Sequence, residues 1–360
     1  MPPEPSAAQW VADRLESDAV HLDVAACGRV STTALMTELA HLRAEGGGGY
    51  VAQALAEPLL ADGRAALAAL VGLAGTDVAF LESAAGAFAV LLAGWPLARG
   101  ARIGTVPSEY GGNARLLRAL AGARGWELVD LPVDPLGRVT EVPAGLELVT
   151  FPHVASQRGV VQPVAEVLAA GVPLVLDVAQ SLGQTAVPPG AAGYVGTSRK
   201  WLCGPRGVGF VVVDPSWEGR LSGPPTLPFT EEGVRRLESP EAHVAGRVGL
   251  AVAVQQWHPA LLPAVHERAA DVRTALAGSG WGVVEPADEP SGITTLTPPA
   301  GAEPGAVRDE LLADGFLTSA VPTSRAADMT APVLRVSTAA WVTGEQVDRF
   351  AAALRRRTPG

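Results

Sequence analysis

The sequence predicts an α/β protein with a seven-stranded, mainly parallel sheet in a large domain and a smaller α+β domain at the C-terminal end. Two observations predict this fold class. Short apolar runs that end in polar or glycine residues alternate with longer Ala- and Leu-rich stretches at helical spacing, as in strands joined by crossover helices. With 360 residues, of which 48% are apolar and 18% charged, the chain is also long enough to bury one or two cores.

Seven apolar runs have the length and flanking residues of buried strands, and helical stretches lie between them. Each of these helices is long enough to close a parallel crossover. The predicted strands are Val78–Leu81, Arg102–Val106, Trp126–Leu131, Leu146–Phe151, Val172–Leu176, Tyr194–Gly196 and Gly209–Val213, and the predicted helices include Ala84–Trp95, Ala114–Gly122 and Val164–Ala170.

The remaining segments complete the predicted organisation. Pro215–Pro228 is rich in Pro and Gly and predicts a surface excursion, whereas Ala242–Trp257 predicts a helix that leads away from the sheet. Gly46–Gly49 predicts either a flexible loop or an active-site lid. We expect residues 1–25 to associate with the small domain, residues 26–257 to form the large domain, and residues 258–360 to form the small domain, with apolar segments at Gly282–Glu285, Gly292–Leu296 and Val333–Val336.

Charge and composition restrict the partners. A net charge of -10 and a pI near 5.2 argue against binding to nucleic acid or to an anionic membrane, both of which need a concentrated basic surface. No apolar run reaches the ~20 residues of a membrane helix, and Pro and Glu stand where a secretory signal is basic, so we expect a cytoplasmic protein. The two cysteines, Cys27 and Cys203, make neither a disulfide framework nor a zinc-ligand spacing. Small molecules and other proteins remain as partners.

Lys200 is the only lysine in a chain whose lysines and arginines total 27, so the other 26 are arginines. The Ala-, Gly-, Pro- and Arg-rich composition indicates a GC-rich coding bias, which explains the arginines. Arginine stays protonated at physiological pH, whereas a lysine amine becomes neutral and nucleophilic through burial or a neighbouring charge. The one remaining lysine is therefore a candidate nucleophile.

A carboxylate follows one of the predicted strands. Val172–Leu176 ends at Asp177, and Gln180 comes three residues later. Ligands of open α/β sheets bind at the carboxyl ends of the strands, where a carboxylate can keep the ring nitrogen of an aromatic cofactor protonated. Asp177 can equally well cap the following helix.

Two segments predict contacts to a phosphate group. Ser83, Ala84 and Ala85 follow a predicted strand and begin an apolar helix, so that small side chains expose the backbone N–H groups at the helix start. Many such turns bind nothing. Ser198 and Arg199 precede Lys200, and their hydroxyl and guanidinium groups suit the same phosphate. The glycines that follow resemble a dinucleotide fingerprint, but they precede a strand where that fingerprint must follow one.

Polar residues after two further strands complete a possible cofactor site. Tyr110 can stack on a flat heteroaromatic ring, although a core-facing tyrosine is the alternative. Ser156 or Gln157 can form a hydrogen bond with a ring hydroxyl. Together these segments supply what one kind of cofactor requires: an amine, a ring-nitrogen partner, a stacking face and a phosphate site.

In these motifs the chain resembles the class V aminotransferase-like group of fold-type I pyridoxal-phosphate enzymes, from about His21 to about Leu354. The resemblance implies the aspartate-aminotransferase-like fold and pyridoxal 5′-phosphate as the cofactor. It implies that Lys200 holds the cofactor, Asp177 pairs with its ring nitrogen, Gln180 approaches its phenolic oxygen and Arg335 binds the substrate α-carboxylate. The residues that carry it are Glu109-Tyr110, Ser156 to Gly159, Asp177 to Gln180, Ser198 to Lys200 and Leu334 to Ser337, with Tyr110 and Arg199 standing where the group usually has histidine.

Within this group the chain is most similar to the C-S lyases of actinobacterial ergothioneine biosynthesis, which cleave hercynylcysteine sulfoxide. That resemblance implies β-elimination to a sulfenate, pyruvate and ammonia, with Lys200 as the general base and with Ala26 and Tyr50 near the substrate. The segments that carry it are Leu22 to Cys27, Gly48 to Ala52, Ser198 to Gly209, Glu289 to Leu296 and Pro332 to Ser337.

Other activities use the same residues. An aminotransferase or an epimerase remains an alternative, because both use the same lysine and aspartate. A cysteine desulfurase needs a mobile cysteine before Arg335, and Thr318 to Thr323 contains none. The resemblance also implies a homodimer with its sites at the interface and with Glu241 to Val244 at the subunit contact.

Overall fold

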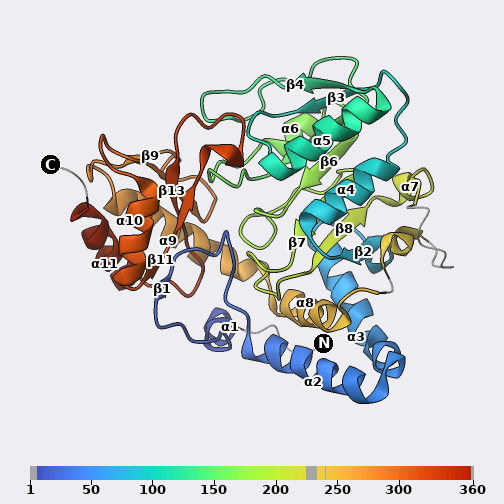
Figure 1. Cartoon of the computed structure of the whole chain (residues 1–360), viewed down its shortest axis with the longest axis horizontal. Coiled ribbons are helices and arrows are strands. Elements are labelled where there is room, and N and C mark those ends of the chain that lie inside the picture. Colours follow the sequence, from blue (N-terminus) through green and yellow to red (C-terminus); the bar gives the residue numbers. More distant parts are fainter. Residues whose placement is uncertain (1–5, 224–232, 240, 358–360) are drawn as a thin grey trace.

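A seven-stranded sheet organises the first two thirds of the chain (Figure 1). The computed structural model describes residues 6–223, 233–239 and 241–357. Every strand of the sheet is parallel to its neighbours except β8, which is antiparallel to both β2 and β7. The spatial order is β2 (Val78–Leu81), β8 (Gly209–Val213), β7 (Gly193–Thr197), β6 (Leu174–Asp177), β5 (Leu148–Pro152), β3 (Arg102–Thr105) and β4 (Glu127–Asp130), which confirms the predicted mainly parallel sheet of seven strands.

Helices cover both faces of this sheet, because alternate strand residues point to opposite sides. In β2, Val78 and Phe80 belong to one buried cluster and Ala79 and Leu81 to another. The first cluster includes side chains of α3 (Tyr50–Ala69), α6 (Val164–Leu168) and α8 (Val244–Gln256), and the second includes side chains of α4 (Ala84–Gly94) and α5 (Gly111–Arg124). The large unit is therefore a three-layer α/β/α arrangement.

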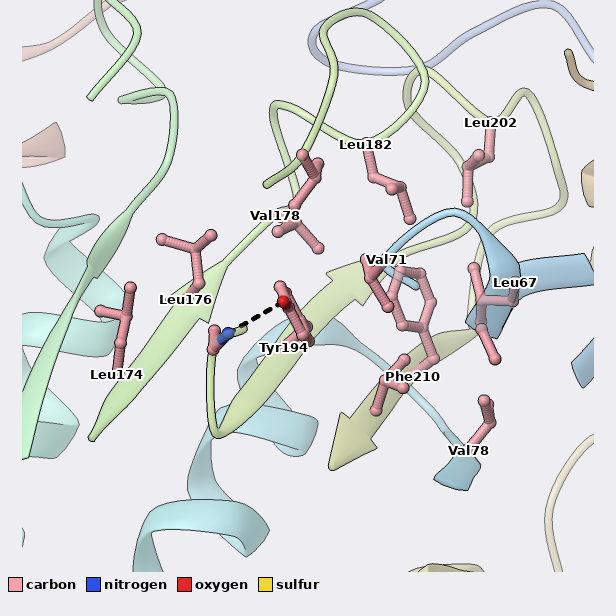
Figure 2. Packing of buried hydrophobic residues seen from close by; sticks show 14 of the residues in the cluster. Leu67, Val71, Val78, Leu174, Leu176, Val178, Leu182, Tyr194, Leu202 and Phe210 are labelled. Atoms are coloured by element: carbon pink, nitrogen blue, oxygen red, sulfur yellow. Dashed lines mark hydrogen bonds between the residues drawn. The ribbon is translucent and has the colours of Figure 1, made fainter. Parts of the chain in front are cut away.

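Figure 2 shows the first cluster at the centre of the sheet, where Leu176, Tyr194 and Phe210 from three neighbouring strands face Leu67 and Val71. Tyr194 is fully buried, and its hydroxyl accepts a hydrogen bond from Ala191 N at 3.0 Å and donates one to Pro188 O at 3.1 Å. A buried phenol that keeps two partners loses little of its hydration energy, so the ring contributes its apolar area to the core.

The C-terminal third forms a second unit with its own core (Figure 1). Its antiparallel sheet packs against three helices, and the N-terminal segment joins it because β1 (Val20–His21) pairs in parallel with β11 (Phe316–Leu317). The domain boundaries themselves remain a prediction. The sheet order is β12 (Ser319–Val321), β13 (Val333–Ser337), β10 (Ile293–Thr297) and β9 (Gly282–Val283), and the helices are α9 (Leu262–Ala275), α10 (Pro304–Ala313) and α11 (Gly344–Arg355), with α1 (Ala7–Ala12) at the N-terminal end.

Two peripheral segments differ from expectation or lie partly outside the described residues. Gly46–Gly49 is neither a flexible loop nor a lid: α2 (Thr32–Gly48) continues through three of these glycines, and only Gly49, with φ 54°, interrupts the chain before α3. These three glycines are exposed, so the helix continues through them without side-chain packing at their positions. Extending an existing helix needs no new nucleus, which offsets the low helix propensity of glycine. The predicted excursion Pro215–Pro228 begins with the short helix α7 (Pro215–Glu218), and its residues 224–228 lie outside the described part.

In the described ranges, no helix has the length and apolar character needed to cross a membrane.

Candidate active site

A cavity of about 580 Å³ lies at the carboxyl ends of the sheet strands and is closed on one side by β12 and β13 of the small unit. The turns after β2, β3, β5, β6 and β7 all open into it, as the doubly wound topology requires. Most of the predicted site residues line it, namely Ala26, Ser83, Ala84, Ala85, Tyr110, Ser156, Asp177, Gln180, Arg199, Lys200 and Arg335.

The turn that follows β7 presents Lys200 to this cavity. Cys203 N donates to Lys200 O at 2.9 Å and Gly204 N to Ser198 O at 3.0 Å, while Cys203 adopts φ 55°, an uncommon conformation for a residue with a side chain. Burial lowers the pKa of Lys200 from 10.5 to about 7, an effect that Asp177 opposes and the nearby arginines reinforce. A large fraction of this amine is therefore neutral near pH 7, as a nucleophile or general base requires.

Asp177 ends β6 and belongs to a buried polar chain. Its Oδ1 accepts from Ala179 N at 2.8 Å, and its Oδ2 accepts from Asn113 Nδ2 at 2.9 Å. The same Asn113 amide donates to Glu109 Oε1 at 3.2 Å, so one side chain connects two buried carboxyl groups. Burial, together with the charge of Asp177, raises the pKa of Glu109 to about 8. Burial also raises the pKa of Asp177, although the Lys200 charge acts in the opposite direction. Asp177 lines the cavity and Glu109 does not, so Asp177 is the carboxyl group of this pair that can face a cationic ligand atom.

Arg335 enters the cavity from β13 and is held on three sides. Its Nη1 donates to Ser156 O at 2.6 Å, and its Nη2 donates to Asp23 Oδ1 at 3.2 Å and Ser319 Oγ at 3.3 Å. Ser319 Oγ in turn contacts both carboxylate oxygens of Asp23 at 2.8 Å. These contacts fix the orientation of the guanidinium group before any substrate binds.

The start of α4 lies at another wall of the cavity. Ser83 caps this helix, its Oγ accepting from Gly86 N at 3.0 Å, and Ala84 and Ala85 line the cavity beside it. Gly209 makes this close packing possible, because a Cβ there would lie 2.2 Å from the Ser83 carbonyl carbon and 2.6 Å from Ala84 N. The backbone N–H groups of Ala84 and Ala85, at the start of the helix, thus face the space that an anion can occupy.

Three predicted site residues do not line the cavity. Tyr50 begins α3 on the outside of the molecule and is 86% exposed. Gln157 is buried with its Nε2 donating to Ser108 O and Asp328 Oδ1, which directs it away from the cavity. Ser198 is fully buried against Gly204, where a Cβ would lie 2.2 Å from its Oγ. Gln180 lines the cavity, but its amide already bonds with Ala25 O and Trp201 Nε1.

The structure also adds residues that were not predicted. Asn113 stands four residues after Glu109 at the start of α5, and this spacing is the signal in the sequence that could have revealed the contact. Asp23, Ser319 and Arg325 reach the site only through the packing of the two units, and nothing in their local sequence indicates it.

Residues 24–240 match the family model for aminotransferase class V. The chain belongs to this family. It is 40% identical to a probable hercynylcysteine sulfoxide lyase from Mycobacterium tuberculosis, an alignment that covers 96% of this chain and 92% of that protein. It is also 29% identical to the isopenicillin N epimerase of Amycolatopsis lactamdurans over 83% of this chain and 85% of the other.

Solved structures share the fold at low sequence identity. A cystine C-S lyase in complex with cysteine persulfide superposes with a TM-score of 0.85 at 19% identity, covering 95% of this chain and 99% of the other. The cysteine desulfurase of Thermococcus onnurineus gives 0.84 at 18% identity and covers 94% of each chain. These likenesses confirm the predicted fold type I architecture.

This class V enzyme uses pyridoxal 5′-phosphate, and the groups around its cavity fit that cofactor. An amine, a buried carboxyl group and the first turn of a helix face one space. The hydroxyl oxygen of Ser156, which lines the cavity, is buried without a hydrogen-bond partner among the described residues. A buried hydroxyl group in this state is destabilising unless a ligand completes it, so it is in keeping with a polar cofactor beside it.

Proposed function

We propose that this protein is a pyridoxal-phosphate-dependent C-S lyase that performs β-elimination on hercynylcysteine sulfoxide, releasing the sulfenate of ergothioneine, pyruvate and ammonia. The observation that carries the proposal is the 40% identity with the mycobacterial relative of that name, which extends over 96% of the chain and thus over both units. The arrangement of Lys200, Asp177 and Arg335 around one cavity supports it.

Each of these three groups has a task in an elimination. Arg335, oriented by Asp23 and Ser319, attracts the α-carboxylate of the substrate with its positive charge. Lys200 then removes the proton from Cα at its Nζ, which its lowered pKa leaves largely neutral. When bound, the cofactor supplies an electron sink that stabilises the charge left on Cα. Asp177 keeps the ring nitrogen of that cofactor protonated, and Asn113 holds the Asp177 carboxyl group in place.

The same three groups also serve an epimerase or an aminotransferase, and the relationship to an isopenicillin N epimerase keeps the first of these as the alternative. A desulfurase has less support. The free cysteines of the described chain are Cys203, which is buried and has its pKa raised to about 12 by burial, and Cys27, which is half-buried beside Ala26. A thiol with such a high pKa is a poor sulfur acceptor at neutral pH.

We also propose that the enzyme is a cytoplasmic homodimer. Large apolar side chains on the neighbouring helices α2 and α3 are exposed in the single chain, which favours burial of these helices against a second subunit. Tyr50 is one of these exposed side chains, so its predicted substrate contact requires that it reach the cavity of a partner subunit. The exposed residues are Met36, Leu42, Tyr50, Val51 and Leu55.

The lyase proposal is tested by adding hercynylcysteine sulfoxide to the purified holoenzyme and measuring pyruvate without any keto-acid acceptor. We expect pyruvate in proportion to substrate consumed, and none from Lys200→Ala. Racemisation of the substrate without pyruvate would establish the epimerase instead. Amino-group transfer that depends on an added keto acid would establish the aminotransferase. A visible absorbance scan of both proteins shows separately whether Lys200 holds the cofactor, because the bound-cofactor band is lost in Lys200→Ala.

A further inference from the structure

Arg325 is a cation in the active-site cavity that the proposed reaction does not use. It ends the short 3-10 turn η4 (Thr323–Arg325) of the small unit and lines the cavity. Its guanidinium carbon lies 5.7 Å from the centre of the Tyr110 ring. In residues 6–223, 233–239 and 241–357, no carboxylate forms an ion pair with it, whereas Arg158 and Arg335 are each paired with an aspartate.

The other cavity cations already have anions assigned to them. Arg335 receives the α-carboxylate, and Arg199 precedes Lys200 at the predicted phosphate site. Arg206 lies three residues before Gly209, which packs against Ser83 at the same end. Arg325 instead enters from the small unit, as Arg335 does, and lines the same cavity. It therefore belongs to the substrate side of the cavity.

The backbone around Arg325 is anchored to the large unit. Gly111 at the start of α5 packs directly under it, since a Cβ there would lie 2.6 Å from Ser324 O and 3.1 Å from Arg325 O. Ala327 N donates to Pro107 O at 3.1 Å. Asp328 forms an ion pair with Arg158. Arg325 thus projects from a fixed turn, which reduces the entropy lost when it binds a ligand.

We propose that Arg325 forms a second anion subsite, which binds a carboxylate on the substituent carried by the substrate sulfur. The enzyme then selects cysteine sulfoxides with two carboxylates: Arg335 binds the one at Cα and Arg325 binds the distal one. The inference rests on the proposed lyase function and deepens it, since the hercynyl group carries a betaine carboxylate of its own. A planar guanidinium beside an aromatic ring suits such a carboxylate through two parallel hydrogen bonds.

The test compares two substrates of nearly equal shape, S-(2-carboxyethyl)cysteine sulfoxide and its carboxamide S-(2-carbamoylethyl)cysteine sulfoxide. Pyruvate release gives kcat/KM for the wild type, Arg325→Gln and the control Arg308→Gln, whose side chain pairs with Asp309 on the exposed surface of α10. We expect the wild type and the control to favour the carboxylate by about 10- to 100-fold, the range of a charged hydrogen bond. Arg325→Gln should treat both substrates alike, with the change in KM and not in kcat.

A binding measurement separates this inference from the lyase proposal. The corresponding thioethers lack the sulfoxide leaving group, and calorimetry gives their dissociation constants from holoenzyme of each variant. If hercynylcysteine sulfoxide yields no pyruvate but Arg325→Gln weakens the binding of only the carboxylate thioether, the lyase proposal fails and the subsite stands. If pyruvate forms equally from both sulfoxides, or Arg325→Gln keeps the preference for the carboxylate, the subsite is overturned and the lyase remains. Arg325→Lys, which keeps the charge, should retain part of the preference.

Discussion

The neutral amine of Lys200 can be tested on its own in the cofactor-free protein. Burial and the neighbouring arginines lower its pKa to about 7, and Asp177 acts against them. We therefore expect Asp177→Asn to lower the pKa of Lys200 further, because the substitution removes the nearby carboxyl group that stabilises the ammonium form. An unchanged pKa would mean that Asp177 is neutral in the cofactor-free protein and does not act on the amine.

The size of the effect follows from the two pKa values. At pH 7, an amine with a pKa of about 7 is half neutral, whereas one with the ordinary value of 10.5 is neutral in roughly one molecule of 3,000. The native amine should thus be available to an electrophile about 1,500 times more often than an ordinary lysine at this pH. Restricted access through the cavity lowers the absolute rate at which Lys200 reacts with the electrophile, but it leaves the midpoint of the pH profile unchanged.

The assay uses the fact that Lys200 is the only lysine of the chain. The apoprotein is treated with trinitrobenzenesulfonate at a series of pH values, and label on the Lys200 peptide is quantified by mass spectrometry, which separates it from the N-terminal amine. Urea-unfolded protein provides the reference with an ordinary pKa. We expect a native midpoint near pH 7 and a lower one for Asp177→Asn. A native midpoint that coincides with the unfolded one would refute the inferred role of burial.

Three further predictions concern stability and binding. Because the pKa of Glu109 is raised to about 8, its contribution to the free energy of unfolding is fully present below the unfolded pKa of 4.5 and is lost as the pH rises. The loss is roughly 2–3 kcal/mol between about pH 5.5 and 7.5. Urea unfolding of the apoprotein should show this loss in the wild type and not in Glu109→Gln. Gly209→Ala should displace the Ser83 turn, which lowers the free energy of unfolding by about 1–3 kcal/mol and weakens cofactor binding in an absorbance titration. The control Gly122→Ala places its Cβ where no atom lies within 4 Å, so stability and cofactor binding should stay unchanged. Arg335→Lys should raise KM about 10- to 100-fold while the visible spectrum of the bound cofactor stays unchanged.

Much of the fold could be predicted because its signals are local. The seven strands follow from apolar runs of strand length, and their observed bounds differ from the predicted ones by at most two residues at either end. The helix predicted at Ala84–Trp95 ends one residue earlier, at Gly94. The prediction for Gly46–Gly49 was wrong because it rested on propensity alone, whereas a helix that has already formed can extend through exposed glycines, as α2 does as far as Gly48.

The site was predictable wherever a residue directly follows a strand. Asp177, Ser83 and Lys200 lie at or just after strand ends, and the topology of a doubly wound sheet brings such residues to one edge. Contacts between distant segments were not predictable. The Asn113 amide meets Asp177 from 64 residues away, and Arg335 pairs with Asp23 across 312 residues.

The sequence by itself thus determined the α/β class, the single lysine and the residues that each strand end contributes, because periodicity and strand-end position are properties of short segments. Only the tertiary structure decided which of these side chains share a cavity, that Tyr50 lies outside the cavity of its own chain, and that Arg325 lies inside it. The tertiary structure also decided the pKa of Lys200. Desolvation and the charges that oppose it come from residues far apart in the chain, and they act on the amine only once the two units have packed together.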